Sequence, residues 1–206
     1  LRNTGMITST TKLCGIFGNP IEHTLSPLIH NAAFGHLKLD YVFLAFKVAR
    51  LKEAVNGIRA LDLKGVSVTI PHKVAVLDYL DEVEEVAGKI GAVNTIVNRD
   101  GRLIGYNTDW SGAIDALEEK IVLKDKTALV LGAGGAARAI AFGLKESGAG
   151  LTILNRTVKK AEMLASEVGC SCGGLEDAAS TTFDLVINTT SVGMFPHTDA
   201  IPIKKE

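Results

Sequence analysis

Apolar runs alternate with segments of helical periodicity along almost the whole chain. The runs predict strands at 14–18, 41–46, 65–70, 93–97, 103–106, 127–131, 151–154 and 183–188. The segments between them predict helices at 48–61, 74–80, 109–119, 136–147 and 158–168, and Ser26-Pro27 predicts one more helix start, with Ser26 as N-cap. This alternation predicts an α/β fold with mainly parallel sheets. Asp100-Gly101 predicts a tight hairpin between two of the strands.

A glycine-rich turn joins the strand at 127–131 to an alanine-rich helix. Gly132 allows the tight turn, Gly134 lets the backbone approach a phosphate, and Ala137 lets helix and strand pack closely. Free amides at the helix start then face the pyrophosphate of a dinucleotide. The predicted contact residues of this loop are Gly132, Ala133, Gly134, Gly135, Ala136 and Ala137.

The end of the next strand selects the cofactor. An acidic side chain there favours NAD, but the chain has Asn155, Arg156 and Thr157, which suit a 2′-phosphate. Arg156 follows Gly132 by 24 residues, near the usual spacing of about 20. We therefore predict NADP binding; the alternative is a solvated arginine in an ordinary loop.

The dinucleotide-binding pattern begins only near Lys126, so the preceding strands and helices should form a domain of their own. We predict a first domain over residues 12–112, a connecting helix and linker over 113–125, and an incomplete doubly wound domain over 126–206. The first domain would bind the substrate.

Composition narrows the classes of partner. The chain has 206 residues, and 47% hydrophobic with 22% charged content is that of an ordinary globular protein. The net charge of −1 and the lack of basic runs argue against nucleic acid and membrane surfaces. No apolar run approaches the roughly 20 residues that span a bilayer, and residues 1–11 lack the apolar segment of a signal peptide.

Cysteine usage fits a reducing compartment. Cys14, Cys170 and Cys172 are too few for a disulfide framework, and the Cys-x-Cys pair has poor zinc spacing. We expect reduced thiols, no metal and a cytoplasmic protein.

Three polar clusters follow strands of the first domain, where open α/β sheets bind ligands. Thr24 and Ser26 at a helix start could hold a carboxylate, although Ser26 could be a plain helix cap. Thr69 and Lys73 follow another strand, and a partly desolvated lysine can exchange protons near neutrality, although most lysines are solvated.

The third cluster flanks the hairpin. It contains Asn94, Asn107 and Asp109; Asp109 could cap the next helix or pair with Lys73. Together the clusters offer hydroxyls that can bind a carboxylate, amides that can bind ring hydroxyls, and a lysine–aspartate pair that can transfer a proton. A small polyhydroxy acid beside a hydride carrier would need these groups.

The chain resembles the shikimate dehydrogenase family, including its quinate-using members, in seven ordered motifs. These are Gly18-Asn-Pro-Ile-Glu-His-Thr-Leu-Ser-Pro27 with His30-Asn-Ala-Ala-Phe34, Gly65-Val-Ser-Val-Thr-Ile-Pro-His-Lys73, Gly91-Ala-Val-Asn-Thr95, Gly105-Tyr-Asn-Thr-Asp-Trp-Ser-Gly112, Gly132-Ala-Gly-Gly-Ala-Ala137, Asn155-Arg-Thr157 and Asn188-Thr-Thr-Ser-Val-Gly-Met194.

The resemblance implies NADPH-dependent, reversible reduction of 3-dehydroshikimate to shikimate in chorismate and aromatic amino acid biosynthesis. Lys73 would be the general acid and base, assisted by Asp109. The implied substrate residues are Thr24, Ser26, Thr69, Lys73, Asn94 and Asp109. The implied residues on the nicotinamide side are Thr189, Thr190, Ser191, Val192 and Met194.

The chain departs from the family at two positions and in length. Thr24 stands where the family usually has serine, and Ser67 where asparagine is common. The family's C-terminal part, which closes the cofactor sheet, is absent, so we expect a fragment with weakened activity or the ordered part of a longer enzyme. The leucine at position 1 leaves open a piece of a multi-enzyme chain. We expect a monomer or homodimer. Two alternatives stay open: a quinate/shikimate dehydrogenase using NAD, and a non-catalytic NADP-binding regulatory fragment.

Overall fold

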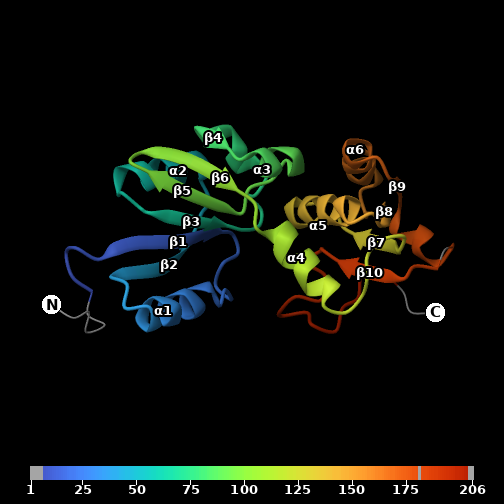
Figure 1. Cartoon of the computed structure of the whole chain (residues 1–206), viewed down its shortest axis with the longest axis horizontal. Coiled ribbons are helices and arrows are strands. Elements are labelled where there is room, and N and C mark those ends of the chain that lie inside the picture. Colours follow the sequence, from blue (N-terminus) through green and yellow to red (C-terminus); the bar gives the residue numbers. More distant parts are fainter. Residues whose placement is uncertain (1–6, 181, 204–206) are drawn as a thin grey trace. The chain divides into compact units, whose positions relative to one another are not determined.

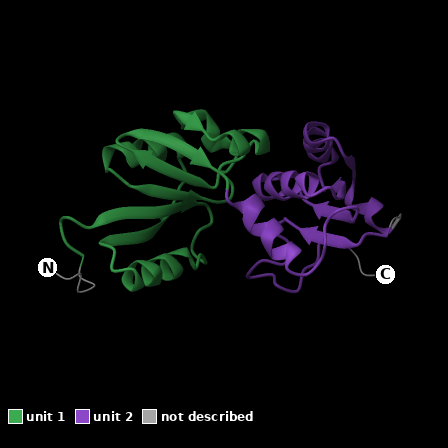
Figure 2. Cartoon of the chain, viewed as in Figure 1, with its two compact units in different colours: residues 1–107 green, residues 108–206 purple. Residues whose placement is uncertain are grey.

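The computed structural model describes residues 7–180 and 182–203, so residues 181 and 204–206 of the predicted second domain lie outside the described residues. The chain divides into two compact units, one ending at Asn107 and the other beginning at Thr108 (Figure 2). The predicted α/β class is confirmed in both units, which we describe separately.

The first unit contains a six-stranded mixed sheet in the order β2-β1-β3-β5-β6-β4 (Figure 1). Its strands are β1 (Lys12–Gly18), β2 (Tyr41–Lys47), β3 (Gly65–Val68), β4 (Glu82–Val83), β5 (Thr95–Arg99) and β6 (Arg102–Tyr106). β1 is parallel to β2 and β3, whereas β5 is antiparallel to both β3 and β6. Consequently β1, β2, β3 and β6 end at the same edge of the sheet at which β5 begins.

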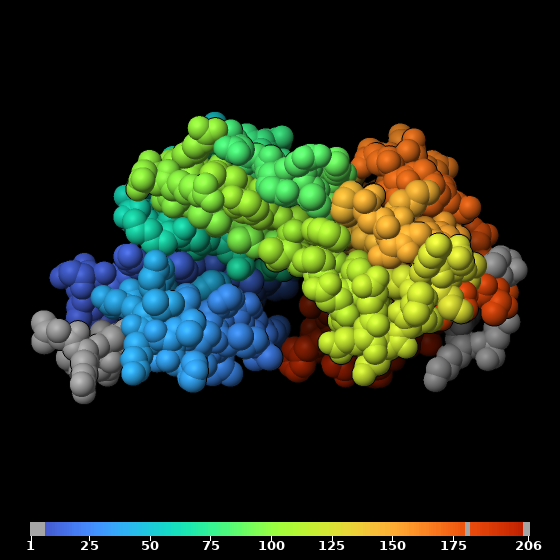
Figure 3. Space-filling view, in the orientation of Figure 1, coloured from blue at the N-terminus to red at the C-terminus, as the bar shows by residue number. Residues whose placement is uncertain are grey.

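Helices cover both faces of this sheet. They are α1 (Ser26–His36), α2 (Leu51–Ala60), the 3₁₀ helix η1 (Ala75–Tyr79) and α3 (Glu85–Ile90). Because side chains alternate along a strand, Phe17 packs in the core with Val55 and Ile58 of α2, while its neighbour Ile16 packs in a second core with Phe34 of α1. No residue of α1 is fully buried, and its outer surface is visible in Figure 3.

The predicted hairpin is confirmed. Asp100 and Gly101 have φ angles of 52° and 91°, and they connect the paired residues Arg99 and Arg102. Positive φ at both central residues is typical of the turn that matches the twist of two antiparallel strands. This turn reverses the chain and makes the first sheet mixed, although most strand pairs remain parallel as predicted.

The second unit contains a four-stranded parallel sheet in the order β10-β7-β8-β9. Its strands are β7 (Thr127–Leu131), β8 (Gly150–Leu154), β9 (Ser171–Gly173) and β10 (Leu185–Asn188). Its helices are α4 (Asp109–Glu118), α5 (Gly135–Glu146), α6 (Val158–Val168) and the 3₁₀ helix η2 (Leu175–Ser180). β8 and β9 lie on one side of β7, and β10 lies on the other. This is the strand order of half a doubly wound, Rossmann-type sheet.

Helix α4 packs closely on α5. The rings of Trp110 and Phe142 meet edge to face at 5.5 Å, and a side chain at Gly143 would collide with Ile114. The helix that the sequence places near the domain connection therefore contributes to the core of the second unit.

Two local expectations differ from the structure. Leu25, not Ser26, is the N-cap of α1, and it makes no side-chain capping bond; Ser26 is the first helical residue. The segment at 74–80 forms the short η1 instead of an α-helix. The sequence reasoning also missed α3, although Glu84, whose side chain accepts from Ala87 N–H at 3.0 Å, and Gly91, with φ of 68°, mark its two ends.

Candidate functional site

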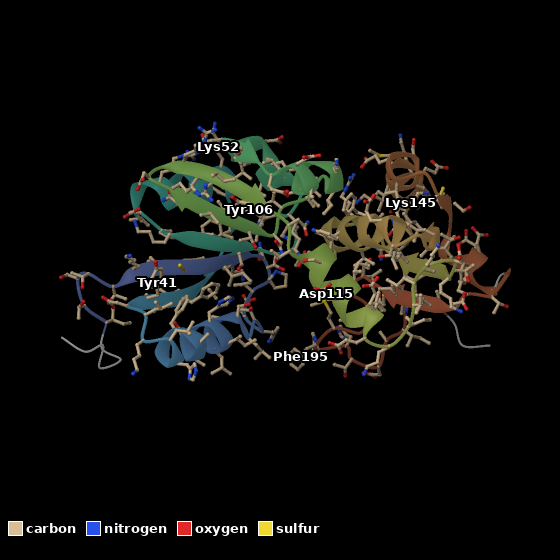
Figure 4. All side chains as sticks on the ribbon, viewed as in Figure 1. Tyr41, Lys52, Tyr106, Asp115, Lys145 and Phe195 are labelled. Carbon is tan, nitrogen blue, oxygen red and sulfur yellow. The ribbon has the colours of Figure 1, made fainter. Side chains whose placement is uncertain are left out.

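The edge of the first sheet at which β1, β3 and β6 end and β5 begins is held together by backbone hydrogen bonds. Thr69 N–H donates to the Phe17 carbonyl at 2.9 Å, and Val68 N–H donates to the Asn94 carbonyl at 2.7 Å. Asn94 N–H in turn donates to the Tyr106 carbonyl at 3.0 Å; Tyr106, labelled in Figure 4, is the last residue of β6. Four separate segments thus converge at one edge.

Thr24 and Ser26 form a hydroxyl pair at the start of α1. The Thr24 hydroxyl donates to Ser26 Oγ at 3.1 Å and accepts from Ser26 N–H at 3.3 Å. With the Thr24 proton engaged, the Ser26 hydroxyl is the group that can donate to an incoming anion. The first turn of α1 holds no acidic residue, so its electrostatics favour a carboxylate.

Glu22 and Lys47 join the loop before α1 to the end of β2. Lys47 Nζ lies 2.8 Å from Glu22 Oε1, and this hydrogen bond lowers the pKa of Glu22 to about 2. Both side chains are more than half exposed, so the pair restrains the loop more than it stabilises the fold.

Lys73 lies in the loop after β3. Its side chain is half-buried, and its carbonyl accepts from Val93 N–H at 2.7 Å. The loop begins with a turn closed by a bond from His72 N–H to the Thr69 carbonyl at 2.9 Å. Thr69, Lys73 and Asn94 therefore belong to neighbouring segments of one edge, as predicted from their positions after or before strands.

Amide side chains support the edge beside β5 and β6. The Asn94 side-chain oxygen accepts from the Thr95 hydroxyl at 2.9 Å, and buried Asn107 donates to the Ala92 carbonyl at 2.9 Å. Asn107 thus fixes the backbone of the turn that precedes Asn94. Asp109 is the first residue of α4 in the second unit and is half-buried; its pairing with Lys73 stays a prediction.

The second unit gathers its candidate residues at the carboxyl edge of its parallel strands. Gly132 N–H donates to the Leu154 carbonyl at 2.8 Å, and Thr189 N–H donates to the Leu131 carbonyl at 2.9 Å. The glycine loop therefore lies between the segment that follows β8 and the segment that follows β10. Doubly wound sheets bind nucleotides at this edge, where the strand order reverses.

The glycines of this loop serve different purposes. Gly132 has φ of 115°, and a Cβ there would collide with the Thr189 hydroxyl. At Gly134, the N-cap of α5, a Cβ would meet nothing within 4 Å. The protein's own packing therefore requires Gly132, whereas Gly134 keeps open the space in front of the helix amides.

A dinucleotide diphosphate fits this arrangement. The first turn of α5 contains no acidic residue, Gly134 supplies no capping side chain, and buried Ala137 lets the helix lie close to the sheet. Amides at such a helix start bind phosphate oxygens. The fit rests on the backbone, so it needs no charged side chain.

Asn155, Arg156 and Thr157 follow β8 as predicted. Asn155 Nδ2 donates to the Thr157 carbonyl at 2.9 Å and shapes the turn, while Arg156 and Thr157 are exposed. An exposed guanidinium at this strand end can bind a phosphate in bidentate fashion.

The segment after β10 is ordered by its own side chains. The Thr189 hydroxyl donates to the Leu131 carbonyl at 2.6 Å, and the Thr190 hydroxyl donates to the Asn188 side-chain oxygen at 2.7 Å. The Asn188 amide donates to the Val192 carbonyl at 2.9 Å. Ser191, Val192 and Met194 are exposed, so the segment offers contacts beyond its internal bonds.

The described residues offer neither a metal cluster nor a membrane-spanning helix. Within the described ranges, no cluster of three or more His, Cys, Asp or Glu side chains could hold a metal ion. No helix in the part of the chain that the structure describes is long and apolar enough to cross a bilayer.

Family models match both units. The model of the shikimate dehydrogenase substrate binding domain matches residues 16–96, and that of shikimate/quinate 5-dehydrogenase matches residues 115–194. A shikimate dehydrogenase (NADP(+)) of Methanothermobacter thermautotrophicus is 50% identical over 209 residues, which cover 96% of this chain and 74% of that relative. The Geobacillus sp. enzyme of the same name is 50% identical over 204 residues, 93% of this chain and 73% of that relative.

Solved structures of shikimate dehydrogenases are also similar to this chain. A crystal structure of a shikimate dehydrogenase in complex with NADP⁺ has a TM-score of 0.90 and 46% identity, over 97% of this chain and 74% of that one. The Thermus thermophilus enzyme in complex with NADP(H) and shikimate has a TM-score of 0.84 and 39% identity, over 94% of this chain and 73% of that one.

The two sheets define the class of protein: an α/β protein with a Rossmann-type unit preceded by a separate α/β unit. Within this class, the chain belongs to the shikimate dehydrogenase family. It spans about three quarters of the length of the relatives that it matches.

Proposed function

We propose that this protein is an NADP-dependent shikimate dehydrogenase that interconverts 3-dehydroshikimate and shikimate. The observation that supports the proposal is that the segments carrying Thr69, Lys73 and Asn94 meet at one edge of the first sheet, in a chain whose second unit has a glycine-rich helix start without acidic residues. The hydroxyl pair of Thr24 and Ser26 follows β1, which ends at the same edge. The named relatives are NADP(+) enzymes, which supports the choice of cofactor. The reaction is a step of chorismate and aromatic amino acid biosynthesis.

The substrate carboxylate would bind the hydroxyl pair of Thr24 and Ser26, with Thr69 beside it. The pair lies in front of a helix N-terminus without acidic residues, which favours an anion. Asn94 and Asp109 would bind ring hydroxyls through their amide and carboxylate. These contacts would fix the orientation of the ring.

Lys73 would act as the general acid and base. When bound, NADPH supplies a hydride to the ketone carbon. In the reduction Lys73 gives its proton to the developing alkoxide; in the oxidation neutral Lys73 takes the proton of the alcohol. Asp109 would hold the ammonium and the reacting hydroxyl. Only two peptide units separate Asp109 from Asn107, so its Cα stays within about 7 Å of the Asn107 Cα.

In the second unit, the amides of residues 132–137 would bind the diphosphate, and Asn155, Arg156 and Thr157 the 2′-phosphate. Thr189, Thr190, Ser191, Val192 and Met194 would line the nicotinamide. Arg156 supports NADP over NAD because an arginine at this strand end can pair with the added phosphate. We also propose a cytoplasmic protein, because its three cysteines are free in the structure.

The deciding experiment mixes the purified chain with shikimate and NADP⁺ and follows the near-ultraviolet absorbance of NADPH. We expect turnover that depends on both compounds. Quinate and NAD, tested in parallel, should give lower kcat/KM. A clear preference for NAD or for quinate would replace this assignment, and binding of NADP⁺ without turnover would favour a regulatory module.

A further inference from the structure

We propose that His72 is a positioning residue for Lys73. Its ring ties the loop that carries the ammonium to the segment that follows β2. The inference rests on the proposed role of Lys73, but it concerns a different residue and a different contact.

The His72 ring is buried within the first unit. His72 is only 8% exposed, and its Nε2 lies 2.9 Å from the Val48 carbonyl oxygen. A carbonyl can only accept a hydrogen bond, so Nε2 must carry a proton and donate. Burial and this hydrogen bond hold the His72 ring in one orientation, unlike a solvated histidine at the surface.

Val48, which accepts this bond, is itself held in place. It is 5% exposed, and its own N–H donates to the Gly18 carbonyl at 3.0 Å, at the end of β1. The His72 ring therefore connects the loop after β3 to the ends of both β1 and β2. The segment that leads to Thr24 and Ser26 also begins at the end of β1.

The backbone of Lys73 is thus held on both sides. On one side, the His72 carbonyl accepts from Val76 N–H at 2.9 Å and the His72 ring reaches Val48. On the other, the Lys73 carbonyl accepts from Val93 N–H at 2.7 Å. Because a lysine side chain is long and flexible, its charge is placed by where its backbone is fixed and by what its head contacts.

Removing the ring donor should move the loop. The Val48 carbonyl would remain buried without its partner, and the loop would shift until water or another donor satisfied it. A displacement of about 1 Å can cost roughly a hundredfold in rate, since proton transfer needs donor and acceptor at hydrogen-bond distance. Substrate affinity depends on many other contacts and should change much less.

The test compares His72→Leu with His72→Gln. Leucine has a similar size and no donor, whereas the glutamine amide can place a donor near the Nε2 position. For His72→Leu we expect kcat to fall roughly ten- to a hundredfold, with KM for shikimate and NADP⁺ within about threefold. The midpoint of the kcat–pH profile should move as well. His72→Gln should restore both kcat and the profile to near wild type.

Asn98→Leu is the matched control. Asn98 is 9% exposed and its amide donates to the Leu63 carbonyl at 2.9 Å, but it lies at the hairpin end of β5, away from the Lys73 loop. This variant also leaves a buried carbonyl without its donor. It should lose stability and keep the wild-type pH profile.

A second measurement does not depend on turnover. Lysines are labelled with ¹³C-methyl groups, and the Lys73 resonance is identified from its loss in Lys73→Arg. That resonance should shift in His72→Leu and stay near the wild-type position in His72→Gln and Asn98→Leu. An unchanged resonance and pH profile in His72→Leu would make His72 purely structural and overturn the proposal. If the wild type does not oxidise shikimate, the proposed function fails, and the resonance still decides the role of His72.

Discussion

The two candidate binding edges are built in different ways. In the second unit, one strand, one loop and one helix start supply the phosphate site, and its donors belong mainly to the backbone. In the first unit, side chains from the ends of β1, β3 and β6 and from the start of β5 must meet. The phosphate site of the second unit therefore depends on local conformation, whereas the site of the first unit depends on the register of a whole sheet.

The largest expected effect tests the side-chain site. For Lys73→Ala we expect kcat to fall by about 10²–10⁴-fold with little change in KM, because general acid–base catalysis is worth about that much. Steady-state kinetics with shikimate and NADP⁺ measure both constants. Lys64→Ala, which removes a lysine just before β3 at the opposite edge of the sheet, should stay near wild type. A large rise in KM with kcat intact would make Lys73 a binding residue only.

The second-largest expected effect concerns the phosphate site of the second unit, whose donors are backbone amides. Substitutions of two glycines test it. Serine is a good N-cap, and Gly134→Ser places its Cβ in open space, so the melting temperature should hold or rise. Because the new side chain stands in front of the helix amides, the Kd for NADP⁺ should rise tenfold or more. Calorimetric unfolding and titration measure the two quantities.

Gly132→Ala is the counterpart of this variant. Its positive φ and the collision with Thr189 predict a clear loss of melting temperature. If Gly134→Ser destabilised the protein and Gly132→Ala did not, the division between a packing glycine and a binding glycine would be wrong.

A third effect concerns the part of the second site that depends on side chains. Arg156 is exposed, so Arg156→Gln should leave stability unchanged. The ratio of kcat/KM for NADP⁺ to that for NAD should fall about tenfold, because one charge-assisted contact to the 2′-phosphate is lost. An unchanged ratio would show that Arg156 is only a solvated loop residue.

The smallest effect is on stability in the helices beside the glycine loop. Arg138, in α5, forms an ion pair with Glu167 of α6, and this hydrogen-bonded partner lowers the pKa of Glu167 below its ordinary 4.5. A lowered pKa in the folded state contributes stability that is present above the ordinary pKa and is lost as the pH falls through the folded value.

Glu167→Gln should therefore reduce the free energy of unfolding at pH 7 by about 1 kcal/mol or less, since the glutamate is partly exposed. In urea unfolding, the difference from wild type should shrink as the pH falls below 4.5 and vanish once the pH is below the lowered pKa of Glu167. The exposed pair of Glu85 and Lys89 serves as comparison, and Glu85→Gln should cause no measurable change.

Elements with a local signal in the sequence form where they are predicted. The strand at 127–131, the helix at 158–168 and the turn at Asp100-Gly101 have the predicted positions, because periodicity and turn chemistry act over a few residues. The pattern along the chain does not predict β4, β9 and the short α3, whose few residues form regular structure only through their neighbours in the sheet or on it.

The contacts of single side chains were less predictable. Thr24 and Ser26 bond to each other, and Ser26 does not cap its helix. His72 has no sequence signal of its own beyond the motif that contains it, and its bond to Val48 joins residues 24 positions apart. No pattern of hydrophobicity signals such a bond, since it depends on how two loops pack.

The amino acid order alone determined the α/β class, the glycine turn and the basic residue after the second strand of the cofactor unit, because each depends on conformational preferences within a short segment. Only the tertiary structure decided which strand ends share an edge and which glycine is needed for packing. It also decided that a buried imidazole anchors the lysine loop. Strand order and the packing of distant loops are set by the burial of a common core, which no short segment specifies by itself.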